Sequence, residues 1–396
     1  MQKKPNLLTL FLLASFPTVG AVLFTPALAQ LLEEFSITTS LAQGTVSVYL
    51  AGYALGQLPY GWLSNRLGRK KTLHIGLAVF AIGALFCATT HTFQLLLIGR
   101  AVMALGGAVG LMMTFAIISD CYPVDEARRV LAYLVLSAAF APGLANLIGG
   151  MLTSFLGWHS CFYFLTGYAV VASILVARLP LTHEAKSGQV SNLHAYLNVL
   201  KQGRFILLAL LGALTTTVIY IFASTAPLIT IYVLDASPYM YGLVSVIPFI
   251  GSVVGCILSA KLSQIVPAHR VISWGITICI SASLVKWGLI QSVGLHIWSL
   301  FIPMPFIYLG IPLIYSNSIA LALGSIENKP VASAIFCACT VGLAFLGVVV
   351  MSWFGLDSLR QTALAFVILC GLMWLVFMFS NRLERRSLMR QAESGS

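Results

Sequence analysis

Apolar residues gather in twelve long runs along the chain, and short polar intervals separate these runs. A helix needs roughly 20 apolar residues to cross a hydrocarbon layer about 30 Å thick. Runs such as Phe205–Leu214 and Phe366–Phe379 are apolar on every face, whereas the strands of a membrane barrel alternate between apolar and polar residues. The pattern therefore predicts an all-α membrane protein with twelve transmembrane helices. Their approximate ranges are 7–31, 42–62, 73–90, 94–118, 130–154, 160–179, 205–230, 240–260, 271–290, 297–322, 332–353 and 359–379.

The longest polar interval divides the twelve runs into two sets of six. A short echo supports two related bundles, because Leu63–Leu67 after the second run resembles Leu258–Leu262 after the eighth. Within the interval, residues 192–201 place their leucines on one side of a helical wheel, which predicts a short surface helix. The expected organisation is an N-terminal six-helix bundle at 1–180, a central cytoplasmic loop at 181–204, a C-terminal six-helix bundle at 205–380 and a cytoplasmic tail at 381–396.

Composition supports a membrane protein and argues against a nucleic-acid partner. Of the 396 residues, 59% are hydrophobic and 8% are charged, while soluble domains carry about 25% charged residues. The net charge of +11 would suit nucleic-acid binding, but 19 of the 22 Lys and Arg residues fall at the termini or in alternate intervals. Cytoplasmic loops of membrane proteins accumulate Lys and Arg in this way. We therefore expect both termini to be cytoplasmic and the first run to be a spanning helix, not a cleaved signal peptide.

The sequence contains no motif of an enzyme or of an ATP-driven pump. No GxxxxGK[ST], HExxH or GxSxG segment occurs, and the eight Cys and seven His residues are scattered without metal-ligand spacing. We therefore expect no catalytic activity, no metal and no cofactor. A channel or a receptor built on a transport fold remains an alternative, which saturable uptake into vesicles would separate from a carrier.

Two basic residues lie inside apolar runs, while all eleven Asp and Glu residues lie in intervals or at the ends of runs. No carboxylate is therefore expected at mid-membrane, where such groups commonly carry protons. An unpaired cation at the position of Arg100 costs about 2.5–3.5 kcal/mol. Two alternatives remain for Arg100: it holds helices together through backbone carbonyls, or it binds an anionic or strongly hydrogen-bonding solute or relays coupling. Lys286, near the outer end of the ninth run, is expected to extend to the outer surface.

A basic turn after the second run carries the most specific motif, Gly61-Trp-Leu-Ser-Asn-Arg-Leu-Gly-Arg-Lys-Lys71. Its spacing resembles the signature loop between helices 2 and 3 of the major facilitator superfamily. Val48–Gly61, Gly99–Gly107 and Ser224–Pro227 also resemble helices of its drug:proton antiporters of the Bcr/CflA type. The resemblance implies that Arg69 contacts Asp120 and latches the inner ends of helices 2 and 4. The signature-loop and gating residues that it implies are Gly61, Asn65, Arg66, Gly68, Arg69, Lys70 and Asp120.

The resemblance also places helices 1, 4, 7 and 10 around a central cavity. An apolar cavity with a few hydrogen-bonding groups suits an amphiphilic organic solute. The chain departs from the Bcr/CflA pattern where Val22 replaces an acid, Asn65 replaces Asp and Asn146 replaces Pro. The candidate substrate or coupling residues are Arg100, Phe24, Thr25, Met103, Met113, Asn146, Thr216, Tyr220, Tyr308, Tyr315 and Asn317.

The resemblance implies the major facilitator fold, the inner membrane of a bacterium and a secondary active transporter that works by alternating access. Efflux of drugs or toxic compounds is the leading hypothesis. The three departures and Arg100 leave two alternatives: transport of an anionic or neutral metabolite, such as a carboxylate siderophore, and uncoupled facilitated diffusion. The expected partners are a small-molecule solute, the lipid bilayer and, where transport is coupled, protons. We expect a monomer.

Overall fold

Every secondary-structure element that the structure describes is a helix. The computed structural model describes residues 5–121, 124–179, 193–263, 265–324, 326, 329–353 and 359–394. Side chains are described over the same ranges except at 58, 61, 62, 65, 115, 116, 119–139, 193–196, 329–331, 333, 334, 359–362 and 385–394.

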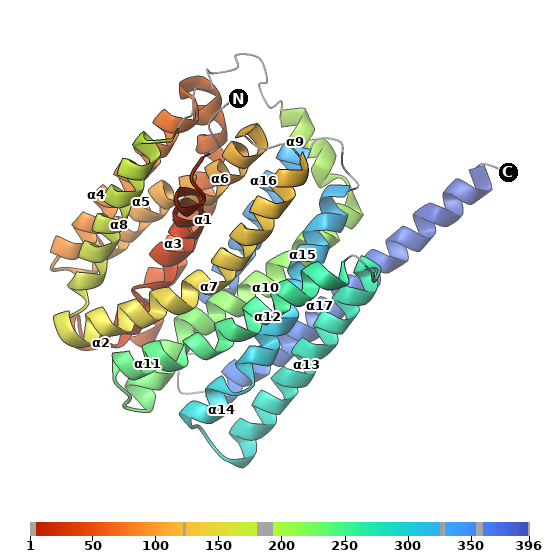
Figure 1. Cartoon of the computed structure of the whole chain (residues 1–396). Helices are drawn as coiled ribbons and strands as arrows, with labels where there is room; N and C mark the ends of the chain where they lie inside the picture. Colours follow the sequence, from red (N-terminus) through yellow and green to blue (C-terminus); the bar gives the residue numbers. More distant parts are fainter. Residues whose placement is uncertain are drawn as a thin grey trace.

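The first half of the chain contains eight α-helices and one short 3-10 helix within the described residues, drawn from red to yellow-green in Figure 1. Side-chain caps begin two of the described helices in this half: the Asn6 side chain accepts a hydrogen bond from the backbone N–H of Leu8, and the Thr38 hydroxyl accepts one from the backbone N–H of Leu41. The elements are α1 (Leu7–Val22), η1 (Thr25–Ala27), α2 (Leu28–Glu34), α3 (Thr39–Leu67), α4 (Arg69–Thr89), α5 (Phe93–Gly107), α6 (Val109–Cys121), α7 (Val124–Leu156) and α8 (His159–Ala177).

The second half of the chain, after the polar interval, also consists of helices within the described residues, and its colours in Figure 1 run from green to blue. One of its elements is a π-helix, η2, which continues directly from the preceding α-helix. The elements are α9 (Leu193–Leu200), α10 (Gly203–Pro227), η2 (Leu228–Val233), α11 (Pro238–Val244), α12 (Val246–Leu262), α13 (Ala268–Ser292), α14 (Ile297–Phe301), α15 (Met304–Gly324), α16 (Lys329–Trp353) and α17 (Leu359–Ser394).

Each of the twelve predicted runs coincides with one helix or with a consecutive group of helices. Within the described residues, ten helices are long and apolar enough to cross a membrane, and Phe140–Leu156 is a shorter apolar helix. The all-helical membrane fold predicted from the sequence is therefore confirmed.

The first, fourth, seventh and tenth spans are all interrupted within their length. The first span changes to a 3-10 turn around Pro26, and the fourth breaks at Ala108. The seventh becomes a π-helix after Pro227, and the tenth breaks before Pro303. Proline removes a backbone donor from the helix, and irregular backbone at membrane depth occurs where it is buried in protein or lines a cavity. The eighth span also breaks, at Ser245.

The two halves of the chain pack against each other along two lines of helices. α3 lies against α16, and α7 lies against both α11 and α12. Further contacts join η1 to α10 and α11, and α2 to η2. The irregular parts of the first and seventh spans therefore lie at the interface between the halves.

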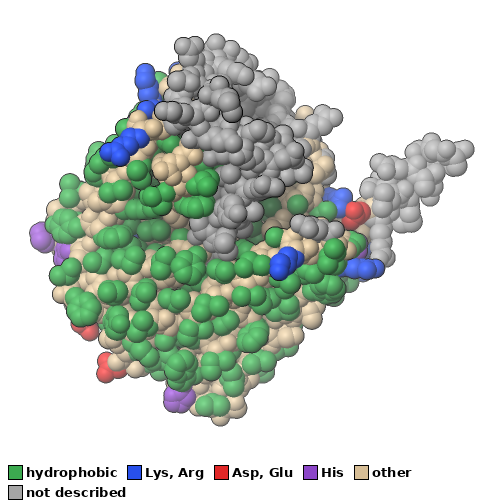
Figure 2. Space-filling view, in the orientation of Figure 1, with side chains coloured by type: hydrophobic (Ala, Val, Ile, Leu, Met, Phe, Trp, Pro, Cys, Tyr) green, Lys and Arg blue, Asp and Glu red, His purple; other side chains and the backbone are tan. Residues whose placement is uncertain are grey.

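Most of the described Lys and Arg side chains lie toward the top and right of Figure 2, where Glu384 pairs with Arg204, and hydrophobic side chains cover much of the remaining surface. We define the basic end as the one that holds Arg69, Lys70 and Lys261, and the acidic end as the one that holds Glu34 and Asp235. This separation fits the predicted distribution of Lys and Arg. Which end faces the cytoplasm stays a prediction, as do the three boundaries between the four predicted segments.

The structure describes parts of two further predicted segments, the surface helix at 192–201 and the tail at 381–396. The predicted surface helix exists as α9, where Val199 is buried while Leu197 and Leu200 are exposed. The predicted tail at 381–396 begins as a continuation of α17, which projects away from the bundle in Figure 1. Residues 381–394 contain no Gly or Pro and many strong helix formers, so nothing in this stretch ends the helix.

Candidate functional site

The predicted signature loop forms a tight turn between α3 and α4. Gly68 has a φ of 80°, in the left-handed region that favours glycine. Arg69 donates a hydrogen bond to the Ser64 hydroxyl. The Lys70 ammonium donates to the Ala177 carbonyl at 2.6 Å, so it caps the C-terminal end of α8, where the helix dipole favours a positive charge. Lys70 therefore joins elements of the first half of the chain.

The predicted latch between Arg69 and Asp120 stays a prediction. The side chains of Asp120, Asn65 and Gly61 lie outside the described residues. Arg66 is exposed at the last turn of α3.

Arg100 is completely buried and caps the broken end of α1. Its Nη1 and Nη2 atoms donate to the carbonyls of Gly20 and Ala21 at 2.8 and 3.4 Å, and its Nε donates to the Thr45 carbonyl on α3 at 3.4 Å. The guanidinium also lies over the Tyr49 ring, 4.4 Å from its centroid, a favourable cation–π geometry.

The position of these carbonyls explains why an arginine can be buried here. α1 ends at Val22, so the helix supplies no regular donor to the last carbonyls of its final turn, those of Gly20, Ala21 and Val22. The Val19 carbonyl accepts from the backbone N–H of Leu23, and the Val22 carbonyl accepts from the Thr25 hydroxyl at 2.9 Å. Arg100 serves the two carbonyls between them. These contacts match the first alternative from the sequence, in which the guanidinium holds helices together.

The break in the first span also carries a polar contact to α7. The Thr25 hydroxyl lies 3.0 Å from the Asn146 amide oxygen, and both side chains are buried. Phe24 is buried beside them, with its ring 4.7 Å from that of Phe162. Asn146, which replaces the usual Pro, therefore contacts the irregular turn of the first span.

Close packing brings α7 onto the second half at the acidic end. A Cβ atom added at Gly150 would lie 2.5 Å from the Pro238 carbonyl oxygen and 3.1 Å from the Gly242 Cα. A side chain at position 150 would therefore force α7 and α11 apart. In this arrangement the two halves are packed together at the acidic end.

A group of tyrosines crosses the interface between the halves nearer its middle. Tyr53 lies on α3, and α3 contacts α10, which carries Tyr220. Tyr220 and Tyr315 are half-buried, as is Thr216 one turn before Tyr220. Thr216 and Tyr220 therefore belong to a helix of the second half that contacts the Tyr53 helix of the first half.

Tyr308 lies deeper in the second half and has an unsatisfied hydroxyl group. The side chain is 1% exposed, and its hydroxyl has no hydrogen-bond partner among the described residues. The rings of Phe249 and Phe222 meet it edge-on, with centroids 5.2 and 6.1 Å away. A buried polar group without a partner is uncommon in native proteins.

The remaining predicted cavity residues are packing residues in this arrangement. Met103 and Met113 are buried in the core of the first half. Asn317 is buried, and its amide nitrogen donates to the Ser259 hydroxyl at 3.1 Å and to the Leu313 carbonyl at 2.9 Å. A hollow of about 200 Å³ elsewhere in the described part contains no predicted site residue and is lined by Thr277, Ile280, Ser281 and Trp374.

The prediction that Lys286 extends to the outer surface is wrong. Its side chain is 1% exposed. The ammonium lies 3.4 Å from the Met304 sulfur and 4.0 Å from the centroid of the Phe366 ring. Lys286 has a flexible side chain that would reach water from an isolated helix, but α10, α15 and α17 enclose it on α13.

The tertiary structure adds three tyrosines that the sequence had not singled out. Tyr49 and Tyr53 are one turn apart on α3, a spacing that indicates a shared face of the helix. Tyr241 lies on α11, which contacts η1, the turn that begins at Thr25, across the interface. No group of three or more His, Cys, Asp or Glu residues suited to a metal occurs in the described part of the chain.

The comparisons with known proteins agree with this arrangement. The chain is 24% identical over 351 residues to multidrug resistance protein D of Escherichia coli (strain K12), covering 87% of each chain. It is 27% identical over 182 residues to a bicyclomycin resistance protein homolog of Haemophilus influenzae, covering 46% of each chain. The crystal structure of a D-xylose-proton symporter has a TM-score of 0.77 over 94% of this chain and 96% of its own, at 14% identity, so it shows the fold alone.

The resemblance to drug efflux proteins that the motifs indicated is confirmed by these relatives. The family model described as Major Facilitator Superfamily matches residues 10–339. This match covers most of the chain and both of its halves. The chain therefore belongs to the major facilitator superfamily, whose members are multi-pass membrane transporters.

Proposed function

We propose that this chain exports uncharged, amphiphilic organic compounds, drugs among them, across the inner membrane of a bacterium by alternating access. The observation that carries the proposal is that all four spans expected around the cavity are broken, and that the breaks in the first and seventh meet at the interface between the halves. Discontinuous helices at the interface between repeats form the substrate sites of many transporters. Two relatives named for drug resistance support export as the direction.

The chemistry of the buried residues favours an uncharged aromatic solute. Tyr220, Tyr308 and Phe222 provide ring faces in the second half, and the Tyr308 hydroxyl offers a free hydrogen-bonding group. The carboxylates whose side chains are described, Glu33, Glu34, Asp235 and Glu384, are exposed or only partly covered. No described group would therefore neutralise a cationic solute.

The alternative of an anionic metabolite is not favoured. Arg100 was the candidate anchor for an anion, and its guanidinium nitrogens donate to the carbonyls of Gly20, Ala21 and Thr45 instead. An anion at this position would have to compete with contacts that hold the broken first span. The relatives also point to drugs and not to carboxylate siderophores.

The expected cycle is a rocking motion of the two halves about the central tyrosines. The contacts of η1 and α2 with the second half close the acidic end, and Gly150 permits the closest approach. We assign the basic end, which carries the predicted cytoplasmic loops, to the cytoplasm, with both termini there. The transporter works as a monomer and catalyses no covalent reaction.

The test is transport by the purified protein in liposomes and export from cells. Cells that lack their major efflux pumps and express the chain are expected to accumulate less of a neutral aromatic probe, such as chloramphenicol, than cells with an empty vector. Liposomes containing the protein are expected to take up the probe saturably. Equal accumulation in both cell lines, together with uptake no faster than in empty liposomes, would reject drug export. A linear dependence of uptake on concentration would indicate a channel.

A further inference from the structure

Lys286 is a buried amine with unusual surroundings. It projects from α13 into a pocket formed by Phe222 of α10, Met304 of α15 and Phe366 of α17. The Nζ atom lies 5.2 and 4.0 Å from the centroids of the two rings and 3.4 Å from the Met304 sulfur. A protonated amine has three N–H donors. Here they face a weak sulfur acceptor and two ring faces.

No described carboxylate accompanies the Lys286 amine. Along the spans around it, the titratable side chains are the thiols of Cys279 on α13 and Cys370 on α17, and the hydroxyls of Tyr308 and Tyr315 on α15 and Tyr220 on α10. The described charged or basic side chains of the same helices lie near their other ends: Arg204, His269, Arg270, Arg382 and Glu384. The thiols and hydroxyls closest to Lys286 along these helices are those of Cys279, Cys370, Tyr308 and Tyr220. The Cys370 thiol contacts the Ser283 hydroxyl, one turn before Lys286, at 3.4 Å. All four groups are neutral in their usual protonation states near pH 7.

Two opposing effects therefore set the charge of Lys286. The ring faces of Phe222 and Phe366 stabilise an ammonium ion. The removal of water without a counter-ion destabilises it. A small change in the pocket shifts this balance, because both effects depend on distances of a few ångströms.

Lys286 and Arg100 are the buried cationic side chains of the described residues, and only Lys286 is suited to exchange a proton. A guanidinium stays protonated in proteins. Arg100 is also held by its three backbone carbonyls. Lysine amines, in contrast, exchange protons readily when they are buried.

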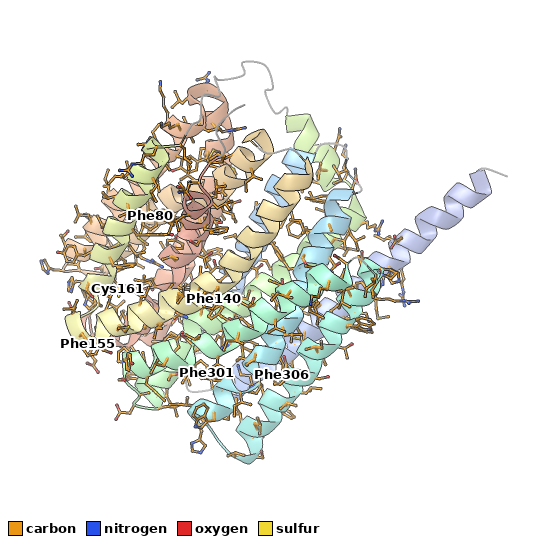
Figure 3. All side chains as sticks on the ribbon, in the orientation of Figure 1. Phe80, Phe140, Phe155, Cys161, Phe301 and Phe306 are labelled. Atoms are coloured by element: carbon orange, nitrogen blue, oxygen red, sulfur yellow. The ribbon has the colours of Figure 1, made fainter. Side chains whose placement is uncertain are left out.

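The pocket of Lys286 is contiguous with the interface between the two halves. The Phe222 ring meets those of Phe301 and Tyr308 edge-on, at 5.5 and 6.1 Å. The Phe301 ring, whose position at the end of α14 is labelled in Figure 3, lies 6.3 Å from that of Tyr241. Tyr241 belongs to α11, which contacts η1 of the first half. A movement between the halves therefore reaches one wall of the pocket through packed aromatic rings.

We propose that Lys286 carries the proton that drives export. The amine binds a proton from the aqueous phase at the acidic end when the pocket opens to water there. After the pocket has changed shape, the ammonium releases this proton to the cytoplasmic water at the basic end. The nitrogen lone pair accepts the proton and later releases it, so no other reactant is needed. This proposal rests on the proposed function, and it assigns the coupling ion to an amine in a chain without a described buried carboxylate.

The test compares two activities: accumulation of the probe driven by a pH gradient, and exchange of the probe across the membrane without a gradient. Wild-type protein, Lys286→Met and the control Lys261→Met are reconstituted into liposomes. Lys261 is an exposed lysine near the end of α12, so its removal changes the net charge equally. Exchange of labelled for unlabelled probe needs no proton movement. We expect Lys286→Met to retain exchange but to lose at least about tenfold in the accumulation driven by a pH gradient.

Methionine has a similar length to lysine and contacts aromatic rings and sulfur well, so Lys286→Met is expected to fold. Lys261→Met is expected to behave as wild type in both assays. Gradient-driven accumulation by Lys286→Met at the wild-type level would overturn the proposal.

A titration without substrate keeps the proposal distinct from the proposed function. Lysine side chains are labelled with carbon-13, and the resonance missing from Lys286→Met identifies Lys286. This resonance is expected to shift with pH over the range in which the protein stays folded. A resonance that does not move over that range would overturn the role of Lys286. If wild-type protein neither exchanges nor accumulates any probe, drug export fails, and the titration still decides whether Lys286 exchanges a proton.

Discussion

The Arg100 guanidinium donates a 2.8 Å hydrogen bond to the Gly20 carbonyl and thereby joins α5 to α1 directly before the break in the first span. The same side chain serves the neighbouring Ala21 carbonyl. A broken helix inside a membrane leaves carbonyls that water cannot reach. A permanent cation that satisfies them allows the break to exist at a fixed place between the two halves.

Arg100→Ala is expected to abolish transport and to lower the thermal unfolding temperature. The substitution leaves the Gly20 and Ala21 carbonyls without donors, and each buried unsatisfied group costs about 1–3 kcal/mol. Arg100→Lys keeps the charge but loses the forked donor geometry, so it is expected to recover only part of the stability. Unfolding in detergent and transport in liposomes measure the two effects. Wild-type stability and transport in Arg100→Ala would show that the arginine neither caps α1 nor binds solute.

Gly150→Ala is expected to reduce transport strongly. The new methyl group would approach the Pro238 carbonyl oxygen to 2.5 Å, which is closer than van der Waals contact permits, so α7 and α11 must separate. The acidic end would then close less often. The matched control is Gly167→Ala on α8, where a Cβ atom meets nothing within 4 Å. Transport rates of the two variants should differ by about tenfold or more, corresponding to at least 1.4 kcal/mol in the closing equilibrium. Equal rates would mean that this contact does not open and close.

Tyr308→Phe and Tyr49→Phe are expected to change stability in opposite directions. The Tyr308 hydroxyl has no described partner, so its removal relieves a buried unsatisfied group and should stabilise the protein by about 1 kcal/mol. The Tyr49 hydroxyl donates to the Pro17 carbonyl at 2.9 Å, and its removal should cost about 1 kcal/mol. Unfolding temperatures of the two variants compare them directly.

Tyr308→Phe also tests whether the Tyr308 hydroxyl binds the solute. Tyr308→Phe is expected to raise the KM for a hydrogen-bonding probe while leaving an apolar analogue unaffected, because only the former uses the hydroxyl. A lower stability of Tyr308→Phe would reveal a hydrogen bond that the described structure lacks.

A permanently cationic dye is expected to be a poor substrate. No described carboxylate lies in the membrane interior to offset its charge, and burying an unpaired cation there is costly. Cells expressing the chain should retain ethidium as cells with an empty vector do, while they export a neutral probe of similar size. Strong ethidium efflux driven by a proton gradient would contradict this expectation.

The sequence by itself determined the number and type of the spans. Runs such as 205–230 are long, and segments such as Phe205–Leu214 are apolar on every face, without the alternation of a barrel strand, so in lipid a helix satisfies their backbone. The basic turn at Gly68–Lys70 was recognisable from its own residues, because a left-handed glycine and adjacent cations are local requirements. The family followed from the same local motifs.

Only the tertiary structure decided what Arg100 and Lys286 do. Both are cations in apolar runs, and the sequence permitted either a surface position or a buried one. Arg100 meets carbonyls 79 and 80 residues away, and rings 64 and 80 residues away enclose Lys286. Such contacts depend on which helix faces pack together. Tyr53 and Tyr241 remained hidden for the same reason, since a tyrosine in a helix becomes a site residue only through its neighbours on other helices.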